Sequence, residues 1–252
     1  MMKPALAFSQ PEFPNEWKTF VNGELIKTSI EQELASWWPK FFGYHLAKIG
    51  CLSGQINTEA CAIKHQFTIA QQQNKGNVIA EIDDLPLLEQ SVDVCLLSHI
   101  LEFSLDPHHV IREANRVLIP NGYLVITGFN PFSLAGLNKI IPFRRKQTPW
   151  QGRFFAPMRI KDWLHLMGYE ILADQRCLHS SLATSSSANF ISRHWQNFAD
   201  KYLPSFGSVY VLVAKKRVLP LTPIKPKWRL QPSFSSVKGV SAKVSSMKNV
   251  LK

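Results

Sequence analysis

The chain of 252 residues has few cysteines, and none of them are closely spaced. Its four cysteines are Cys51, Cys61, Cys95 and Cys177, and they form no Cys-x-x-Cys motif. This scarcity argues against a disulfide scaffold and against a zinc site built from several cysteines, and it fits a reducing compartment. The sequence also lacks an apolar run of membrane-spanning length, and its N-terminus lacks the apolar stretch of a signal peptide. We therefore expect a cytoplasmic protein without a membrane span.

Acidic residues are missing from the C-terminal tail. Residues 215–252 contain ten Lys and Arg but no Asp or Glu, whereas residues 1–214 contain 19 basic and 18 acidic residues. The formal net charge of +11 therefore comes almost entirely from the tail. Its Lys-, Ser- and Pro-rich composition shows no apolar period and predicts disorder. Two roles stay open: a solvated extension that aids solubility, or a weak, salt-sensitive contact with RNA or an anionic surface.

The rest of the sequence is rich in residues that build a hydrophobic core. Apolar residues make up 45% of the chain, which includes 16 Phe and 7 Trp. This composition excludes a wholly disordered or fibrous protein. The length is near the upper limit for a single hydrophobic core. We expect an N-terminal helical extension over residues 1–43, one folded domain over residues 44–216 and a basic tail over residues 217–252.

Short apolar or β-branched runs alternate with helical patterns along the body of the chain. A helical period predicts a helix over Leu25–Phe42, and a second pattern predicts one over Ile160–Met167, ended by Gly168. Strands are predicted over Tyr44–Ile49, Phe67–Ala70, Val78–Ile82, Ser91–Ser98, Tyr123–Phe129, Tyr169–Ala173 and Ser208–Ala214. Residues 177–207 are polar and predict an excursion from the sheet.

Asp106 and Pro107 predict the start of a further helix. The Asp carboxylate can accept the free N–H groups of the first turn, and proline loses nothing at the first helical position. Pro120, Asn121 and Gly122 then predict the end of this helix and a turn of the chain. Strand, helix, turn and strand in this order indicate a parallel sheet with a right-handed crossover.

The stretch from Asp84 to Pro131 contains a series of short motifs. They are L-P after the third predicted strand, S-x-D-V entering the fourth, H-x-L-E leaving it, D-P opening the helix and R-E-x-x-R-V-L-x-P-x-G closing it. Together they resemble the core of class I S-adenosylmethionine-dependent methyltransferases, in particular the methyltransferase type 11 group. The resemblance implies an α/β, Rossmann-like fold with a mostly parallel seven-stranded sheet flanked by helices. It also implies S-adenosyl-L-methionine as cofactor, bound across the C-terminal ends of the first and fourth strands.

The resemblance places the cofactor-binding residues in four loops. The glycine loop after the first strand matches Lys48–Gly54, and the end of the second strand, which holds the ribose, matches Gln71 or Gln72. The predicted cofactor-binding residues are Gly50, Cys51, Gly54, Gln71, Glu81, Ile82, Ser98 and His99. From the residues alone, Gly50 and Gly54 could equally form a tight turn, Glu81 could be a solvated loop acid and His99 a satisfied or helix-capping histidine.

This sequence departs from the family pattern in the glycine loop. Lys48 stands where the family has an acid, and Leu52 stands where it has a glycine. We expect Lys48 to repel the ammonium group of the cofactor and Leu52 to occupy the place of its methionine part, so the double change Lys48→Glu, Leu52→Gly should raise affinity. The segment between the second and third predicted strands is also shorter than the dozen or so residues of a parallel crossover. Either its helix is missing, or the strands pair differently, or the strand assignment is wrong.

Two functions remain open from the sequence. The first is methyl transfer from S-adenosylmethionine to an unidentified acceptor, expected to be a small molecule. The second is a binding or scaffold role with a decayed cofactor site, with an RNA association through the basic tail. No catalytic residue is assigned, but His99 is the candidate general base if the acceptor must lose a proton. His108 and His109 lie beside Asp106 without further converging ligands, so no metal site is predicted.

Overall fold

The computed structural model describes residues 12–72, 75–139, 141, 147–179, 182 and 206–218. All of them belong to one compact unit with the bounds Met1–Leu219. The basic tail beyond Val218 lies outside the described residues, as does most of the polar excursion predicted over residues 177–207. The predictions for these two segments therefore stay predictions, as do the predicted domain boundaries.

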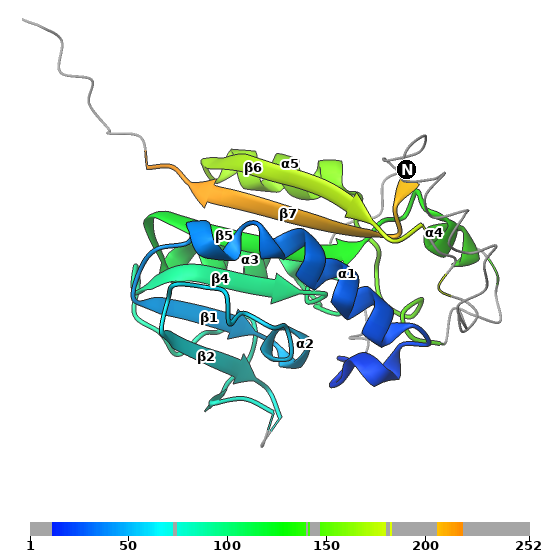
Figure 1. Cartoon of the computed structure of the whole chain (residues 1–252), viewed down its shortest axis with the longest axis horizontal. Coiled ribbons are helices and arrows are strands. Elements are labelled where there is room, and N and C mark those ends of the chain that lie inside the picture. The colour runs from blue at the N-terminus through cyan, green and yellow to red at the C-terminus, as the bar shows by residue number, and fades with distance from the viewer. Residues whose placement is uncertain are drawn as a thin grey trace, which may run out of the picture. The chain divides into compact units, whose positions relative to one another are not determined.

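A seven-stranded sheet organises the described residues, in the order β3-β2-β1-β4-β5-β7-β6 (Figure 1). Strands β1 to β5 pair in parallel with one another, whereas β7 runs antiparallel to both β5 and β6. This arrangement confirms the predicted mostly parallel, Rossmann-like sheet. The strands are β1 (His45–Ile49), β2 (His65–Ala70), β3 (Val78–Ile79), β4 (Val92–Ser98), β5 (Leu118–Phe129), β6 (Tyr169–Cys177) and β7 (Val209–Lys216).

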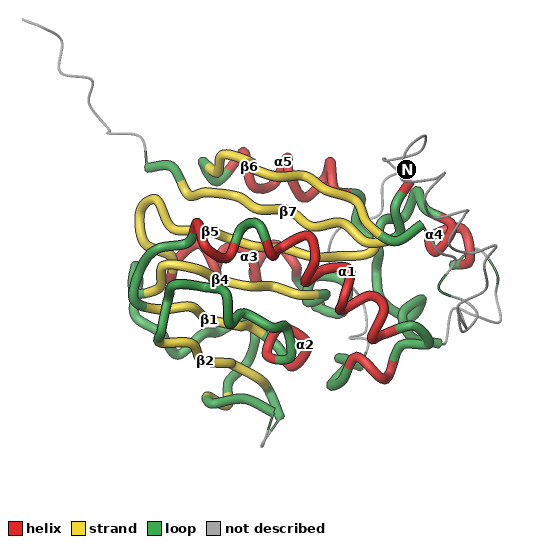
Figure 2. The backbone as a smooth tube through the Cα atoms, viewed as in Figure 1, coloured by secondary structure: helices red, strands yellow, loops and turns green. Residues whose placement is uncertain are grey.

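Helices cover both faces of the sheet (Figures 1 and 2). The first face carries α1 (Gly23–Ala35) and α2 (Cys51–Gly54), and the opposite face carries α3 (Pro107–Val117) and α5 (Pro157–Leu166). A short helix, α4 (Leu134–Asn138), follows β5, and single 3-10 turns lie at Trp17–Thr19 and Trp38–Lys40. Each face has its own buried apolar cluster, as expected when a sheet is covered on both sides. Within the described parts of the chain, no helix has the length and apolar character needed to cross a membrane.

The helix predicted from Asp106 and Pro107 is α3. An Oδ1 atom of Asp106 accepts the backbone N–H of His109 at 3.1 Å, and Pro107 is the first helical residue. One face of this helix is apolar and buried, and it consists of Val110, Ile111, Ala114 and Val117. The predicted turn at residues 120–122 instead lies inside β5, which begins at Leu118. The pairing of β5 with β4 shifts register there, between Val92 and Val94.

The predicted helix Leu25–Phe42 is wrong at its C-terminal end. Helix α1 stops at Ala35, and residues 38–40 form a separate 3-10 turn. Pro39 lacks a backbone donor and disfavours α-helical geometry at Trp38, so the helix cannot continue through this point. The last strands, by contrast, extend beyond their predicted ends. Strand β6 continues to Cys177 because it pairs with β7 along its whole length.

Strands β2 and β3 pair in parallel although the connection between them is short. Only Ile69–Val78 and Ala70–Ile79 are paired, so β3 is shorter than the predicted Val78–Ile82. The backbone N–H of Asn77 donates to the Thr68 carbonyl at 2.8 Å, and the Asn77 side-chain oxygen accepts the Thr68 N–H at 2.9 Å. The described residues of the connection, 71–72 and 75–77, form no helix. Of the three explanations for the short connection, the described residues therefore support the first, in which the crossover helix is missing.

Candidate active site

A cavity of about 450 Å³ lies at the carboxyl ends of β1 to β4. Its walls include Gly50 after β1, Gln71 after β2, Ile82 after β3 and His99 after β4. The chain leaves β1 for β2 on one side, whereas β4 lies on the other side of β1, so the order of the sheet reverses at this point. Such a switch point forms a crevice outside the strand ends, and a cavity of this volume suits a small molecule.

The sheet brings five of the eight predicted cofactor-binding residues to this cavity. They are Gly50, Cys51, Gln71, Ile82 and His99. Gln72, the alternative match to the family's ribose acid, lines it as well. These residues lie far apart in the sequence, but parallel strands end at the same edge of the sheet and therefore place their following loops side by side. Their role in cofactor binding stays a prediction.

Gly50 has a backbone conformation and a position that suit glycine. Its φ angle is +85°, in the region that side chains disfavour. A Cβ atom on Gly50 would lie 2.1 Å from Cδ1 of Ile100, which also lines the cavity. The Gly50 N–H donates to the Ile69 carbonyl of β2 at 2.7 Å. Gly50 therefore allows β1 to turn sharply into α2 directly beneath the cavity.

Gly54 and Ser98 do not line the cavity, although both were predicted to bind the cofactor. A Cβ atom on Gly54 would lie 2.7 Å from Cγ2 of Thr68, so this glycine allows α2 to pack closely against β2. Ser98 is fully buried, with its hydroxyl 2.9 Å from that of Thr127. Its N–H donates to the Ser53 hydroxyl at 2.8 Å. The two residues hold the framework of the site together.

Glu81, another of the predicted cofactor-binding residues, also lies off the cavity wall. Its exposed carboxylate accepts a hydrogen bond from the side-chain amide of Gln71. The other amide atom of Gln71, the oxygen, is an acceptor that suits a hydroxyl group. Glu81 therefore acts on the cavity through Gln71, which brings an acid next to the position where the family's ribose acid is missing.

Lys48 does not face the cavity. Its Nζ atom donates to the Ile56 carbonyl at 3.2 Å, on the face of the sheet that carries α1 and α2. Partial burial lowers the pKa of the Lys48 ammonium, and a nearby thiol, Cys61, has the opposite effect. The expectation that Lys48 repels a ligand inside the cavity is therefore wrong, since alternating residues of a strand point to opposite faces.

Leu52 is a core residue, although part of it lines the cavity. Only 2% of Leu52 is exposed, and it belongs to the buried cluster that contains Trp17 and Phe20. The expectation that its side chain occupies the place of a ligand stays a prediction. Cys51 is half-buried beside it, and burial raises the pKa of this thiol, so its environment favours a neutral thiol over a thiolate.

His99 and Glu102 form a buried polar pair at the end of β4. Neither side chain is exposed, and His99 Nδ1 lies 3.1 Å from Glu102 Oε1. The same carboxylate oxygen accepts the backbone N–H of Phe129 at 2.8 Å. Nε2 of His99 has no hydrogen-bond partner within the part of the chain that the structure describes. When Nδ1 donates to Glu102, Nε2 carries the free lone pair and can accept a proton.

The backbone and ring contacts of His99 are set by the tertiary structure. Its φ angle is +52°, and its ring centroid lies 4.1 Å from that of Phe129 and 5.6 Å from that of Trp17. A non-glycine residue in this backbone region is uncommon and is often found at functional sites. The H-x-L-E motif places Glu102 three residues after His99, so this spacing is the one sequence signal for the pair.

Sequence reasoning missed one wall of the cavity, which is formed by residues 12–15. This N-terminal segment is tied to α2 by several hydrogen bonds. Trp17 Nε1 donates to the Leu52 carbonyl at 3.2 Å, and Gln55 Nε2 donates to the Asn15 carbonyl at 2.8 Å. The aromatic residues Phe13, Trp17 and Phe20 could have indicated that this segment packs on the body, because exposed aromatics are costly.

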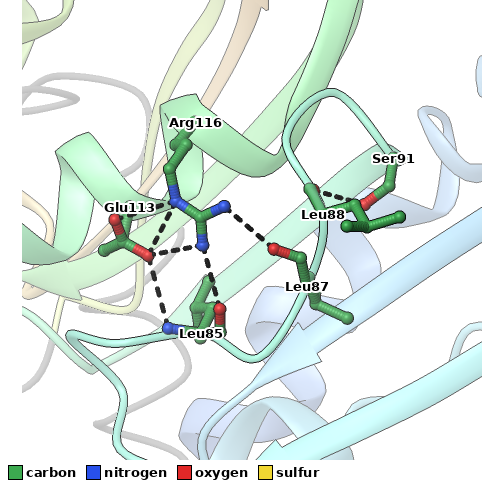
Figure 3. Close-up of polar contacts among 6 residues, drawn as sticks. All are labelled: Leu85, Leu87, Leu88, Ser91, Glu113 and Arg116. Atoms are coloured by element: carbon green, nitrogen blue, oxygen red, sulfur yellow. Dashed lines mark hydrogen bonds and ion pairs between the residues drawn. The ribbon is translucent and has the colours of Figure 1, made fainter.

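A charged network holds the loop between Ile82 and β4 against α3 (Figure 3). Arg116 donates to the carbonyl oxygens of Leu85 and Leu87, each at 2.9 Å. It also bonds both carboxylate oxygens of Glu113 at 2.9–3.2 Å. This arrangement explains the R-V-L part of the motif, in which Arg116 positions the loop that follows Ile82 at the cavity.

The variant Arg116→Ala is expected to lose about 2 kcal/mol of the free energy of unfolding at pH 7, the scale of charge-assisted hydrogen bonds. The hydrogen bonds from Arg116 hold the pKa of Glu113 below its ordinary value of 4.5. The stabilisation by this ion pair is therefore complete at a pH above the ordinary pKa of Glu113, and it decreases as the pH falls through the lowered pKa. Urea denaturation of the protein and the variant between pH 3 and 7 measures the difference.

Arg112→Ala, on the same helix, is the matched control for Arg116→Ala. Arg112 is 63% exposed and lies 3.8 Å from Asp106, so its loss should change the stability by less than about 0.5 kcal/mol. Equal losses for both variants, or a loss for Arg116→Ala that does not shrink at low pH, would contradict the role given to the Arg116–Glu113 pair.

Comparison with known proteins agrees with this geometry. The family model described as "Methyltransferase domain" matches residues 47–126, from β1 to β5. The uncharacterized protein YafS of Escherichia coli is 41% identical over 221 residues, which cover 88% of each chain. The chain belongs to the class I methyltransferase family. A second relative, the uncharacterized protein MJ1123 of Methanocaldococcus jannaschii, is 35% identical over 161 residues, which cover 61% of this chain and 76% of the relative.

Solved methyltransferase structures share the fold of this methyltransferase domain. A SAM-dependent methyltransferase of Thermotoga maritima, described as a possible histamine N-methyltransferase, superposes with a TM-score of 0.57 at 18% identity, covering 80% of this chain and 100% of that one. The [4+2]-cyclase SpnF superposes with a TM-score of 0.53 at 18% identity, covering 85% and 88%. At these identities the likeness concerns the fold alone.

Proposed function

We propose that this protein transfers a methyl group from S-adenosylmethionine to a small-molecule acceptor. The observation that carries the proposal is the single cavity to which Gly50, Gln71, Ile82 and His99 come from four separate strand ends. The fold by itself does not fix the reaction, because it also occurs in a protein named as a [4+2]-cyclase. The chemistry of the residues that line the cavity therefore supports the proposal more strongly than the fold does.

The residues of the cavity fit the parts of S-adenosylmethionine. Gly50 lines the cavity at the carboxyl end of β1, where the methionine part of the ligand can lie. The amides of Gln71 and Gln72 can hydrogen-bond the ribose hydroxyl groups, with Glu81 orienting Gln71. The buried, apolar Ile82 provides a contact for adenine. Each part of the ligand thus meets a group of matching polarity.

Bound S-adenosylmethionine would supply a methyl group already activated by a positively charged sulfur. The protein therefore has to hold the acceptor in line with that methyl group and exclude water, which lowers the entropic part of the barrier. An acceptor that carries a proton on its nucleophilic atom must also lose it. His99 Nε2 is the group in the cavity wall that can take this proton, while Glu102 fixes the orientation of the imidazole ring.

Calorimetric titration of the full-length protein with S-adenosylhomocysteine tests the proposal. We expect saturable binding, and we expect Gln71→Ala to weaken it by about 1–2 kcal/mol, since one hydrogen bond to the ribose is lost. Gln175→Ala, an exposed glutamine of β6 outside the cavity, is the matched control and should bind like the original protein. No heat and no thermal shift at millimolar ligand would contradict the proposal and favour a decayed cofactor site.

A further inference from the structure

The cavity lacks the carboxylate that the family motif would place after β1. Lys48 occupies that position, and its ammonium group is bound to the Ile56 carbonyl outside the cavity. S-adenosylmethionine carries an ammonium group on its methionine part, and ammonium groups bind most strongly to carboxylates. Because the side chain at position 48 does not face the cavity, a carboxylate that binds this ammonium group has to come from another segment.

Glu12 is the one carboxylate among the described residues that line the cavity. It belongs to the N-terminal segment, which lies next to Cys51 and Leu52 of the glycine loop in the cavity wall. The remaining polar side chains of the wall are uncharged amides and the imidazole of His99. Glu12 is thus the residue that can give this end of the cavity a negative charge.

The residues that follow Glu12 are anchored to the loops around the cavity. Gln55 of the turn after α2 bonds both the Asn15 carbonyl, at 2.8 Å, and the Cys51 carbonyl, at 3.3 Å. Glu16 forms an ion pair of 2.5 Å with Lys75, which lies in the loop after β2. The N-terminal segment is therefore tied to two of the loops that form the cavity. Leu52 contributes to the same attachment, because its carbonyl accepts the indole N–H of Trp17 at 3.2 Å.

We propose that Glu12 holds the ammonium group of the cofactor. The Trp17–Leu52 hydrogen bond fastens the N-terminal segment to the glycine loop, and this segment brings the carboxylate to the cavity wall. The inference rests on the proposed function, since it assigns a binding residue for the same ligand.

Two ligands that differ only in the ammonium group test this assignment. They are S-adenosylhomocysteine and its deaminated analogue, titrated by calorimetry into the full-length protein. Glu12→Gln should weaken binding of S-adenosylhomocysteine about tenfold, because a charged partner is replaced by a neutral one of the same shape. The same variant should change binding of the deaminated analogue less than twofold. Glu12→Lys should weaken S-adenosylhomocysteine further.

Glu59→Gln is the matched control, since Glu59 is an exposed carboxylate outside the cavity and its loss changes the net charge equally. It should leave both affinities unchanged. The melting temperature of the ligand-free Glu12→Gln protein should equal that of the original, because the Glu12 side chain is exposed. Equal weakening of both ligands, or none, would overturn the assignment while leaving the proposed function intact. Failure of the original protein to bind either ligand would overturn the proposed function and this inference together.

Discussion

Replacement of Trp17 by alanine is expected to lower the free energy of unfolding by about 3–5 kcal/mol, the range for removal of a large buried aromatic side chain. Only 1% of Trp17 is exposed, and its ring packs at 6.0 Å from Phe20 and 5.6 Å from His99. Its indole N–H also donates a hydrogen bond to the Leu52 carbonyl. Because the N-terminal segment depends on this anchor, binding of S-adenosylhomocysteine should fall at least tenfold as well.

Trp37→Ala provides the comparison for Trp17→Ala. Trp37 is only half-buried and lies at the protein surface between Lys40 and Phe41, so its loss should cost about 1–2 kcal/mol and leave ligand affinity unchanged. Urea denaturation gives the stabilities, and calorimetry below the unfolding transition gives the affinities. If Trp17→Ala were as stable as Trp37→Ala, the N-terminal segment would not be part of the folded core.

Restoration of the family glycine by Leu52→Gly is expected to destabilise the protein by about 4 kcal/mol. The buried side chain leaves a cavity, at a cost of about 2–5 kcal/mol, and glycine in a helix adds about 1 kcal/mol. The sequence-based expectation for the ligand was a gain in affinity for S-adenosylmethionine. The packing of Leu52 in the cluster that contains Trp17 and Phe20 favours a loss of affinity instead. Affinity should therefore fall together with stability.

The partner change Lys48→Glu should also give no gain in affinity. A carboxylate at this position would lie near the Ile56 carbonyl, which now accepts a hydrogen bond from Lys48, and two acceptors repel each other. Leu52→Met is the control for Leu52→Gly, since it conserves volume and should cost less than about 1.5 kcal/mol. A double variant Lys48→Glu, Leu52→Gly that bound S-adenosylmethionine more tightly than the original protein would contradict this account of the glycine loop.

The proposed site thus depends on the N-terminal segment as much as on the strand ends. The glycine loop departs from its family at two positions, and the N-terminal segment contributes Glu12 to the cavity wall and Trp17 to the buried cluster around Leu52. Truncation of the N-terminus of this protein would therefore remove part of the site. The glycine motif alone is also not enough to judge whether a related protein binds the cofactor, because a binding residue can come from a segment distant in sequence.

Local sequence patterns were sufficient to predict most of the fold. The apolar run of β4, the Asp106-Pro107 helix start and the motif around Arg116 each depend on neighbouring residues, and each was found at its predicted place. The mostly parallel, seven-stranded sheet followed from the resemblance that these motifs carry, whereas the order of the strands came from the structure. The errors lie where tertiary contacts override local preference, as at the long β6, which is set by its pairing with β7.

The sequence by itself determined the class of fold, the loops that carry the site and five of its residues, because chain order at parallel strand ends fixes which loops converge. Only the tertiary structure decided what Lys48, Leu52, Gly54, Glu81 and Ser98 do. Whether a side chain faces a cavity, a core or a neighbouring strand depends on contacts between segments distant in the chain. The tertiary structure likewise revealed the wall formed by residues 12–15 and showed that Nε2 of His99 has no hydrogen-bond partner among the residues described. Neither follows from local preference, since both arise from packing across the sheet.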